Sequence, residues 1–158
     1  MLFRSKEINK SYSYQSPCRC RGFLFCILDC LKQKQTYTFG KEEKLKSRKQ
    51  IEQLFREGKS ISAYPLRLLW MPQNNERFLQ CGVSVSSRHF KHAVDRNKIK
   101  RRMREAYRLN KNVLEQMLLE KEMKCSLFWI YTAKTILPFN EIESACVSGL
   151  QKLMRNLT

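Results

Sequence analysis

Hydrophobic residues recur along the chain with two spacings, one typical of amphipathic helices and one typical of strands. Apolar positions three and four residues apart predict three helices, over residues 48–57, 93–122 and 141–154. Alternating or uninterrupted apolar runs predict three strands, over residues 60–71, 78–86 and 125–132. The predicted order is helix, strand, strand, helix, strand, helix, which indicates an α+β fold: one small sheet with helices packed on it.

Several polar residues mark the expected ends of these helices. Ser47 is a plausible N-cap for the first helix, and Gly58 is expected to end it as the C′ residue just past the last turn. Asn140, with Glu143 three residues later, has the pattern of a capping box at the start of the last helix.

The helix predicted from residue 93 has an apolar side and a cationic side when its residues are placed 100° apart. Its apolar side contains Ile99, Met103, Ala106, Tyr107, Asn110, Val113, Leu114 and Met117. Its cationic side contains Lys100, Arg104 and Arg108, with Asn97 and Arg101 beside them, while Lys98, Arg102 and Glu105 point away from the core. The sequence therefore predicts a helix that packs on one side and presents positive charge on the other.

The formal net charge of +17 is distributed unevenly. It is +5 over residues 1–38, +12 over residues 39–111 and zero over residues 112–158. Residues 88–111 alone hold ten Lys or Arg against two acids, and like charges four residues apart destabilise an isolated helix. A solvated surface helix is the plainer interpretation, but repeated repulsion favours a polyanionic partner, and nucleic acid fits best. An anionic membrane surface comes second, because a basic amphipathic anchor with exposed Trp or Phe is missing.

The basic stretch resembles the signature of the protein subunit of bacterial ribonuclease P. The matching positions are Ala93, Val94, Arg96, Asn97, Lys100, Arg101, Arg104 and Glu105. Lys98 stands where the family usually has Arg, so a point charge replaces a planar fork there. The resemblance extends over about residues 39–157 and implies an RNA-binding domain over 39–158. It also implies a left-handed β-α-β crossover through the basic helix, whereas about 98% of such crossovers are right-handed.

The resemblance further implies a function. In the family, the RNA subunit holds the Mg²⁺ ions and performs hydrolysis, and the protein helps to bind precursor tRNA and its 5′ leader. The chain is thus expected to be the protein component of ribonuclease P, a cytoplasmic endoribonuclease that produces mature tRNA 5′ ends, with no cofactor and no membrane partner of its own. The resemblance implies contacts with the catalytic RNA from Arg96, Asn97, Lys100, Arg101 and Arg104, and secondary contacts from Lys98, Arg102 and Arg108.

A second implied surface is a cleft between the first helix and the sheet, which in the family receives the single-stranded leader. Phe55 matches a family aromatic on the first helix, and aromatic rings suit stacking on unpaired bases. Ile51 falls where another Phe is common, and Leu69 where a strand aromatic can occur. Phe55 could equally be a core residue, since half of an amphipathic helix is buried.

Residues that could perform catalysis do not form a recognisable group in this sequence. The acids of the body are scattered and form no D-x-D or D-x-E pattern, and the two histidines, His89 and His92, fit connector residues better than an acid–base pair. The chain by itself is therefore expected to be non-catalytic, without a metal site. Two rival interpretations use the same basic helix: a ribosomal or assembly protein, and a DNA-binding module reading bases through Asn97.

Residues 1–38 differ in composition from the body and are expected to form an extension, either a disordered tail or the product of a start placed too far upstream. The spacing of Cys18, Cys20, Cys26 and Cys30 lacks the paired C-x₂-C arrangement of common zinc sites. An apolar run over residues 22–28 is too short to span a bilayer. The other cysteines lie in predicted strands or a helix and are expected to be buried and reduced: Cys81, Cys125 and Cys146.

Overall fold

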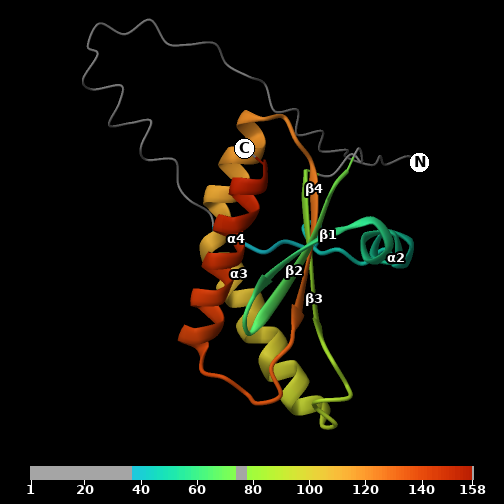
Figure 1. The fold of residues 1–158 in the computed structure, drawn as a ribbon, viewed down its shortest axis with the longest axis vertical. Helices are drawn as coiled ribbons and strands as arrows, with labels where there is room; N and C mark the ends of the chain where they lie inside the picture. Colours follow the sequence, from blue (N-terminus) through green and yellow to red (C-terminus); the bar gives the residue numbers. More distant parts are fainter. Residues whose placement is uncertain (1–36, 74–77, 158) are drawn as a thin grey trace, which may run out of the picture. The chain divides into compact units, whose positions relative to one another are not determined.

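The structure is a computed structural model that describes residues 37–73 and 78–157, so the expectations for residues 1–36 lie outside it. Three helices and four strands make up these ranges (Figure 1). In chain order they are α2 (Arg48–Glu57), β1 (Lys59–Ala63), β2 (Leu66–Pro72), β3 (Leu79–Val85), α3 (Ala93–Glu120), β4 (Cys125–Tyr131) and α4 (Phe139–Leu157). Within the described ranges, no helix combines the length and the apolar character needed to span a bilayer.

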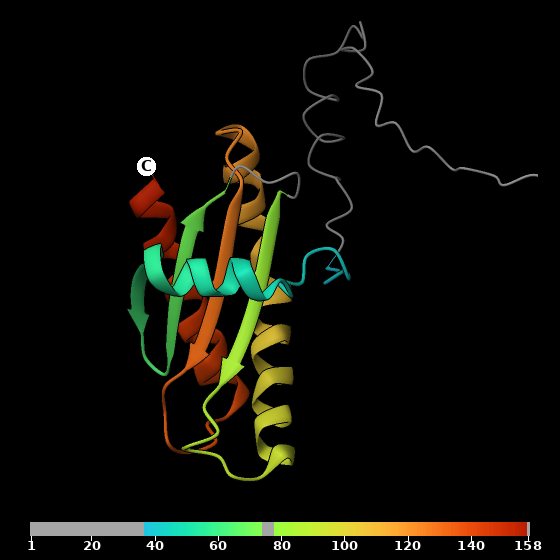
Figure 2. The same ribbon diagram turned by 90° about the vertical axis from the view of Figure 1, so that its right-hand side faces the viewer.

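The four strands form one mixed sheet in the order β1-β2-β4-β3. β2 pairs antiparallel with both β1 and β4, whereas β3 pairs parallel with β4. α3 and α4 pack side by side on one face of the sheet, and α2 crosses the other face (Figures 1 and 2). The predicted α+β class is confirmed, with helices on both faces of a small sheet.

The connection from β3 through α3 to β4 is left-handed. Seen from the α2 side, β3 and β4 both point down, β4 lies to the left of β3, and α3 passes behind the sheet (Figure 2). A right-handed crossover would place β4 on the other side of β3. The handedness implied by the family resemblance is therefore confirmed.

The single strand predicted over residues 60–71 is wrong, because the chain turns back at Tyr64 and Pro65 to form the β1–β2 hairpin. Ala63 pairs with Leu66 across this turn. The sequence contains a signal for this turn. The positions that face the main core are odd-numbered in β1 and even-numbered in β2, whereas the buried Leu69 faces α2. Such a change of phase requires a turn or a bulge.

The helix ends differ from expectation in two places. Ser47 occupies the N-cap position of α2 as predicted, but its side chain makes no capping hydrogen bond. Gly58 has φ −68° and ψ 141°, so it is not the left-handed C′ residue expected. A Cβ at Gly58 would lie 2.2 Å from the Leu54 carbonyl oxygen, which explains the glycine by close approach rather than by handedness. α4 begins at Phe139, so Asn140 lies inside the helix and the capping-box interpretation is wrong.

The main hydrophobic core fills the space between the sheet and the α3–α4 layer, and a smaller cluster lies under α2. The three cysteines of the described ranges are free and buried, as predicted. Burial raises the pKa of the Cys125 and Cys146 thiols to about 12, so both stay protonated at neutral pH.

The apolar side of α3 follows the prediction in its first half and departs from it later. Ile99, Met103, Ala106 and Tyr107 are all buried. In the second half, Leu114 is buried as predicted, but the other buried positions are Lys111 and Leu118, and Asn110 and Met117 are only half-buried. Val113 is 60% exposed, so its assignment to the apolar side is wrong.

Met103 provides a direct test of this packing. Met103→Ala should lower the free energy of unfolding by about 2–5 kcal/mol, because it leaves a cavity beneath α3. Val113→Ala on the exposed side of the same helix should change it by less than about 0.5 kcal/mol. Chemical denaturation of both variants measures the two values, and equal effects would contradict the observed orientation of α3.

Candidate nucleic-acid interface

The side chains of five of the eight predicted RNA-binding residues of α3 make no hydrogen bond or ion pair within the described part of the chain. These residues, called here the α3 basic face, are Asn97, Lys98, Lys100, Arg101 and Arg104. Lys100 is half-buried and the other four are exposed. Their polar groups are therefore available to a ligand.

Arg96 is positioned differently from these five. Its guanidinium Nη1 donates to the backbone carbonyls of Phe90 and Lys91, at 2.8 Å and 2.6 Å. Both carbonyls belong to the connector that leads into α3. Arg96 thus fastens this connector to the first turn of the helix, and part of its donor capacity is used inside the protein.

Arg102 and Arg108 also bond to the protein itself. Arg102 donates to the Leu137 carbonyl in the loop before α4. Arg108 forms a two-point ion pair with Glu105, with N–O distances of 2.9 Å and 2.5 Å, and donates to the Tyr37 carbonyl. The hydrogen bond from Arg108 holds the pKa of Glu105 below its usual value. The structure thus divides the cations of α3 into those that join elements and those that face outward.

The α3 basic face lies beside the β3 edge of the sheet. Burial raises the pKa of the Cys81 thiol in β3 well above its usual value, and the positive charges of Arg104 and Lys111 oppose that shift. α3 packs against β3, which is an edge strand of the sheet. Figure 2 shows α3 running along this edge of the sheet.

Lys111 is the one cation in the basic stretch 88–111 that is buried, and its burial was not predicted. Its ammonium lies 2.7 Å from a carboxylate oxygen of Glu43 and 3.0 Å from one of Glu115. Burial alone would lower its pKa, but the two carboxylates raise the pKa above the usual value. The spacing of Lys111 and Glu115 was a visible signal for one of the pairs.

Residues 37–46, called here the strap, lie along β3 and α3. The Leu45 amide donates to the Cys81 carbonyl at 3.0 Å, and the Cys81 amide donates to the Glu43 carbonyl at 2.7 Å. The Phe39 ring meets the Tyr107 ring edge-on at 5.7 Å. The strap is thus attached to both elements immediately before the chain enters α2.

The α2 side of the sheet brings together the three residues predicted to bind a leader. Phe55 is 52% exposed, and its ring packs edge-on against Phe128 at 5.3 Å. Leu69 is buried in the same small cluster as Phe128, and Ile51 packs partly buried against it. Phe55 is therefore neither a fully buried core residue nor an isolated one: half of it remains accessible beside a second aromatic ring.

Glycine permits the position of the Phe128 ring. Gly82 of β3 pairs with Phe128 in the sheet, and a Cβ at Gly82 would lie 2.4 Å from the ring. The next register row on the same face of the sheet, two residues further along β4, holds Ser62, Arg67, Ile130 and Ser84. Ser62 and Arg67 are exposed, and the other two are half-buried. The sequence analysis missed Arg67, although its position alternates with buried Leu66 and Leu68.

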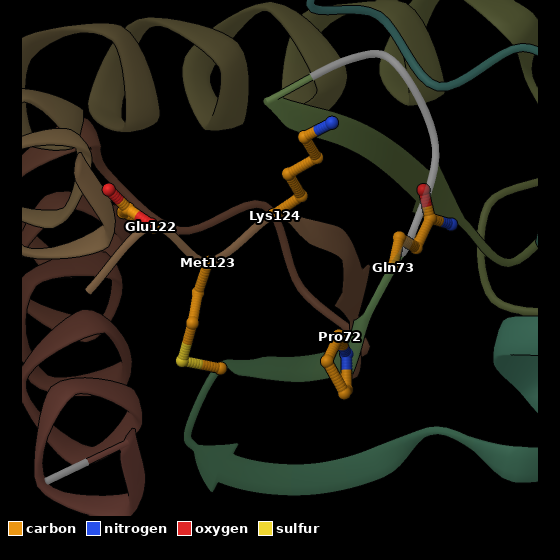
Figure 3. Close-up of a pocket in the computed structure, with 5 residues that line it drawn as sticks. All are labelled: Pro72, Gln73, Glu122, Met123 and Lys124. Carbon is orange, nitrogen blue, oxygen red and sulfur yellow. The ribbon is translucent and has the colours of Figure 1, made fainter.

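A cavity of about 330 Å³ lies between the end of β2 and the turn after α3 (Figure 3). Its lining residues are Pro72, Gln73, Glu122, Met123 and Lys124. The single carboxylate, that of Glu122, lies apart from the Lys124 ammonium and has no second acid or histidine beside it in the lining (Figure 3). Across the described ranges, no group of three or more His, Cys, Asp or Glu side chains could hold a metal ion.

Comparison with known proteins connects this geometry to a family. The family model for ribonuclease P matches residues 39–154. The chain belongs to the ribonuclease P protein family. A Porphyromonas gingivalis ribonuclease P protein component is 33% identical over 124 residues, which cover 77% of this chain and 90% of that protein. A Clostridium botulinum ribonuclease P protein component is 35% identical over 115 residues, which cover 71% of this chain and 95% of that protein.

Solved ribonuclease P proteins share the fold. The Staphylococcus aureus protein gives a TM-score of 0.59 at 19% identity, over 70% of this chain and 94% of that one. The Thermotoga maritima protein gives a TM-score of 0.55 at 23% identity, over 73% of this chain and 98% of that one. Membership of the family makes the chain a subunit of a ribonucleoprotein endoribonuclease with a role in tRNA 5′ processing. The rival assignments to ribosome assembly and DNA binding are thereby set aside.

Proposed function

We propose that the α3 basic face binds the catalytic RNA of ribonuclease P, and that the α2 side of the sheet binds the 5′ leader of precursor tRNA. In this proposal the chain acts in the cytoplasm and helps the RNA subunit to remove the leader and produce the mature tRNA 5′ end. Residues 39–158 form the RNA-binding domain, and residues 1–38 are an extension to it.

The observation that carries the first half of the proposal is the set of unpaired cations on α3. Three arginines of this helix, Arg96, Arg102 and Arg108, donate hydrogen bonds to acceptors within the protein. Lys98, Lys100, Arg101 and Arg104 lie within seven positions and have none in the described part of the chain. Their mutual repulsion is relieved by a polyanion, and each phosphate they neutralise releases condensed counterions.

The second half of the proposal rests on the accessible face of Phe55. Its ring and the half-buried Ile130 offer apolar surface for unpaired bases, and Arg67 supplies a cation on the same side of the sheet. Stacking on aromatic rings tolerates different bases, which suits leaders of varied sequence. Ile51 and Leu69 are aliphatic and cannot stack as rings do. They pack in the cluster beneath this surface.

Hydrolysis and Mg²⁺ binding are assigned in this proposal to the RNA subunit. Supporting this, His89 and His92 lie exposed on the connector before α3, and the carboxylates of the described ranges form no cluster suited to a metal. A protein general acid–base pair would need two such groups within reach of one substrate bond. The contribution of the chain is therefore binding and orientation.

The double variant Lys100→Ala/Arg104→Ala tests the α3 basic face. Its affinity for the catalytic RNA should fall, and the slope of log affinity against log salt should flatten by about 1.4–1.8, because two phosphate contacts contribute roughly 0.7–0.9 each. Arg155→Ala, on the exposed side of α4, is a control that removes charge elsewhere. Titrations over a salt series, with thermal melts of each variant, provide the measurement. Wild-type affinity and slope in the double variant would show that α3 is only a solvated surface.

Phe55→Ala tests the surface on the α2 side of the sheet that is proposed to bind the leader, called here the leader surface. Loss of one stacked base should weaken binding of a precursor tRNA to the assembled ribonucleoprotein by about 1–3 kcal/mol. Binding of mature tRNA, which has no leader, should be unchanged. Leu119→Ala removes an exposed apolar side chain from α3 and serves as the control. An equal effect of Phe55→Ala on precursor and mature tRNA would refute the assignment.

A further inference from the structure

The strap carries cations that the sequence analysis did not assign to any partner. Lys41, Lys44 and Lys46 lie in it, and none of the three forms an ion pair within the described ranges. One acidic side chain of the strap, that of Glu43, forms an ion pair with Lys111. The ion pair with a buried lysine thus neutralises one of the two acidic side chains of the strap, while the other, Glu42, lies at the surface beside the three lysines.

Neighbouring residues of the strap have different surroundings. Leu45 is buried in the cluster under α2, whereas the Lys46 side chain is exposed and the Lys44 side chain lies over Phe39. The Lys44 ammonium lies 5.5 Å from the centre of the Phe39 ring, and that ring packs on Tyr107 of α3. Lys44 is therefore linked to α3 through the Phe39 ring.

Placing these lysines beside a helix that is already cationic is unfavourable for the protein alone. The strap is nevertheless held there by backbone hydrogen bonds to β3, by the Glu43–Lys111 ion pair and by the bond from Arg108 to the Tyr37 carbonyl. Like charges gathered by specific contacts are typical of a surface that receives a polyanion.

We propose that the strap is a second arm of the interface with the catalytic RNA, and that Lys44 and Lys46 bind its phosphates in continuity with the α3 basic face. This inference rests on the proposed function of α3. It assigns the strap to the catalytic RNA rather than to the leader, because Lys44 lies over the Phe39 ring, which in turn packs on Tyr107 of α3. Glu43 is then a positioning residue, which sets the location of the two lysines through Lys111.

The double variant Lys44→Ala/Lys46→Ala should flatten the salt dependence of catalytic-RNA binding by about 1.4–1.8 in log–log slope, for two contacts of roughly 0.7–0.9 each. Lys152→Ala/Arg155→Ala removes the same charge from α4, which packs against β1 and β2 at the other edge of the sheet, and should leave the slope unchanged. Thermal melts check the fold, and Lys46→Ala alone, at an exposed position, should give half the change if the double variant is unstable.

Glu43→Gln distinguishes the effect of where the strap lysines lie from the effect of net charge. It raises the net charge by one, so a purely electrostatic surface would bind RNA more tightly. If the strap must be held by Lys111, affinity for the catalytic RNA should instead fall, while the strap lysines remain present. Unchanged or tighter binding by this variant would overturn the positioning role.

The outcomes also distinguish this inference from the proposed function. If Lys100→Ala/Arg104→Ala loses affinity while Lys44→Ala/Lys46→Ala behaves like the α4 control, the strap inference fails and the function of α3 stands. If the strap variant loses affinity only for precursor tRNA and not for the catalytic RNA, the strap belongs to the leader surface and the inference also fails. If neither double variant changes the slope, the proposed function itself fails.

Discussion

The arrangement of the two candidate surfaces depends on one buried cation, Lys111, held between the carboxylates of Glu43 and Glu115. Glu115 belongs to the same helix, but Glu43 belongs to the strap, whose next residues lead directly into α2. The ion pair therefore connects the helix that carries the basic face to the segment that delivers Phe55 to the opposite side of the sheet. Removing one partner of a buried ion pair commonly costs about 3–5 kcal/mol. The cost here lies toward the low end, since both carboxylates are about 29% exposed.

A second constraint is the repulsion that a cationic helix must bear until its ligand arrives. The cations of α3 fall into two groups. Arg96, Arg102 and Arg108 bind backbone carbonyls or Glu105 and so hold the connector, the loop before α4 and the strap. The cations between them face outward. The buried side chains of Ile99, Met103 and Tyr107 fix the helix that carries these outward cations. A helix that is already fixed loses less conformational entropy when RNA binds.

Sequence pattern predicted the elements whose periodicity is strong and local. The apolar run of β4 and the seat of α3 were both evident, because burial selects the same residue types in any fold. The β1–β2 hairpin was missed, since its signal is only a change of phase around Pro65. The left-handed crossover came from the family resemblance alone, as local periodicity carries no information about chain handedness. The buried Lys111 could not be foreseen, because its partner Glu43 is distant in sequence.

In the candidate site too, some features were evident from the sequence and others depend on tertiary contacts. The signature identified the cationic residues, but only tertiary contacts reveal that Arg96 and Arg102 are occupied by loop carbonyls while Lys100 and Arg104 are not. The resemblance singled out Phe55 on the first helix, but the position of its half-exposed ring depends on Phe128 and Gly82, which come from two strands. Arg67 shows that alternation alone could have added one more residue to the leader surface.

The central claim is that this chain contributes binding and no catalytic group. The most direct measurement is multiple-turnover cleavage of a precursor tRNA at low Mg²⁺, by the cognate catalytic RNA alone, by the chain alone and by the two together. The account predicts no cleavage by the chain alone, slow cleavage by the RNA and faster cleavage by the mixture, all at the same bond. Cleavage by the chain without RNA, or a mixture no faster than the RNA, would contradict it.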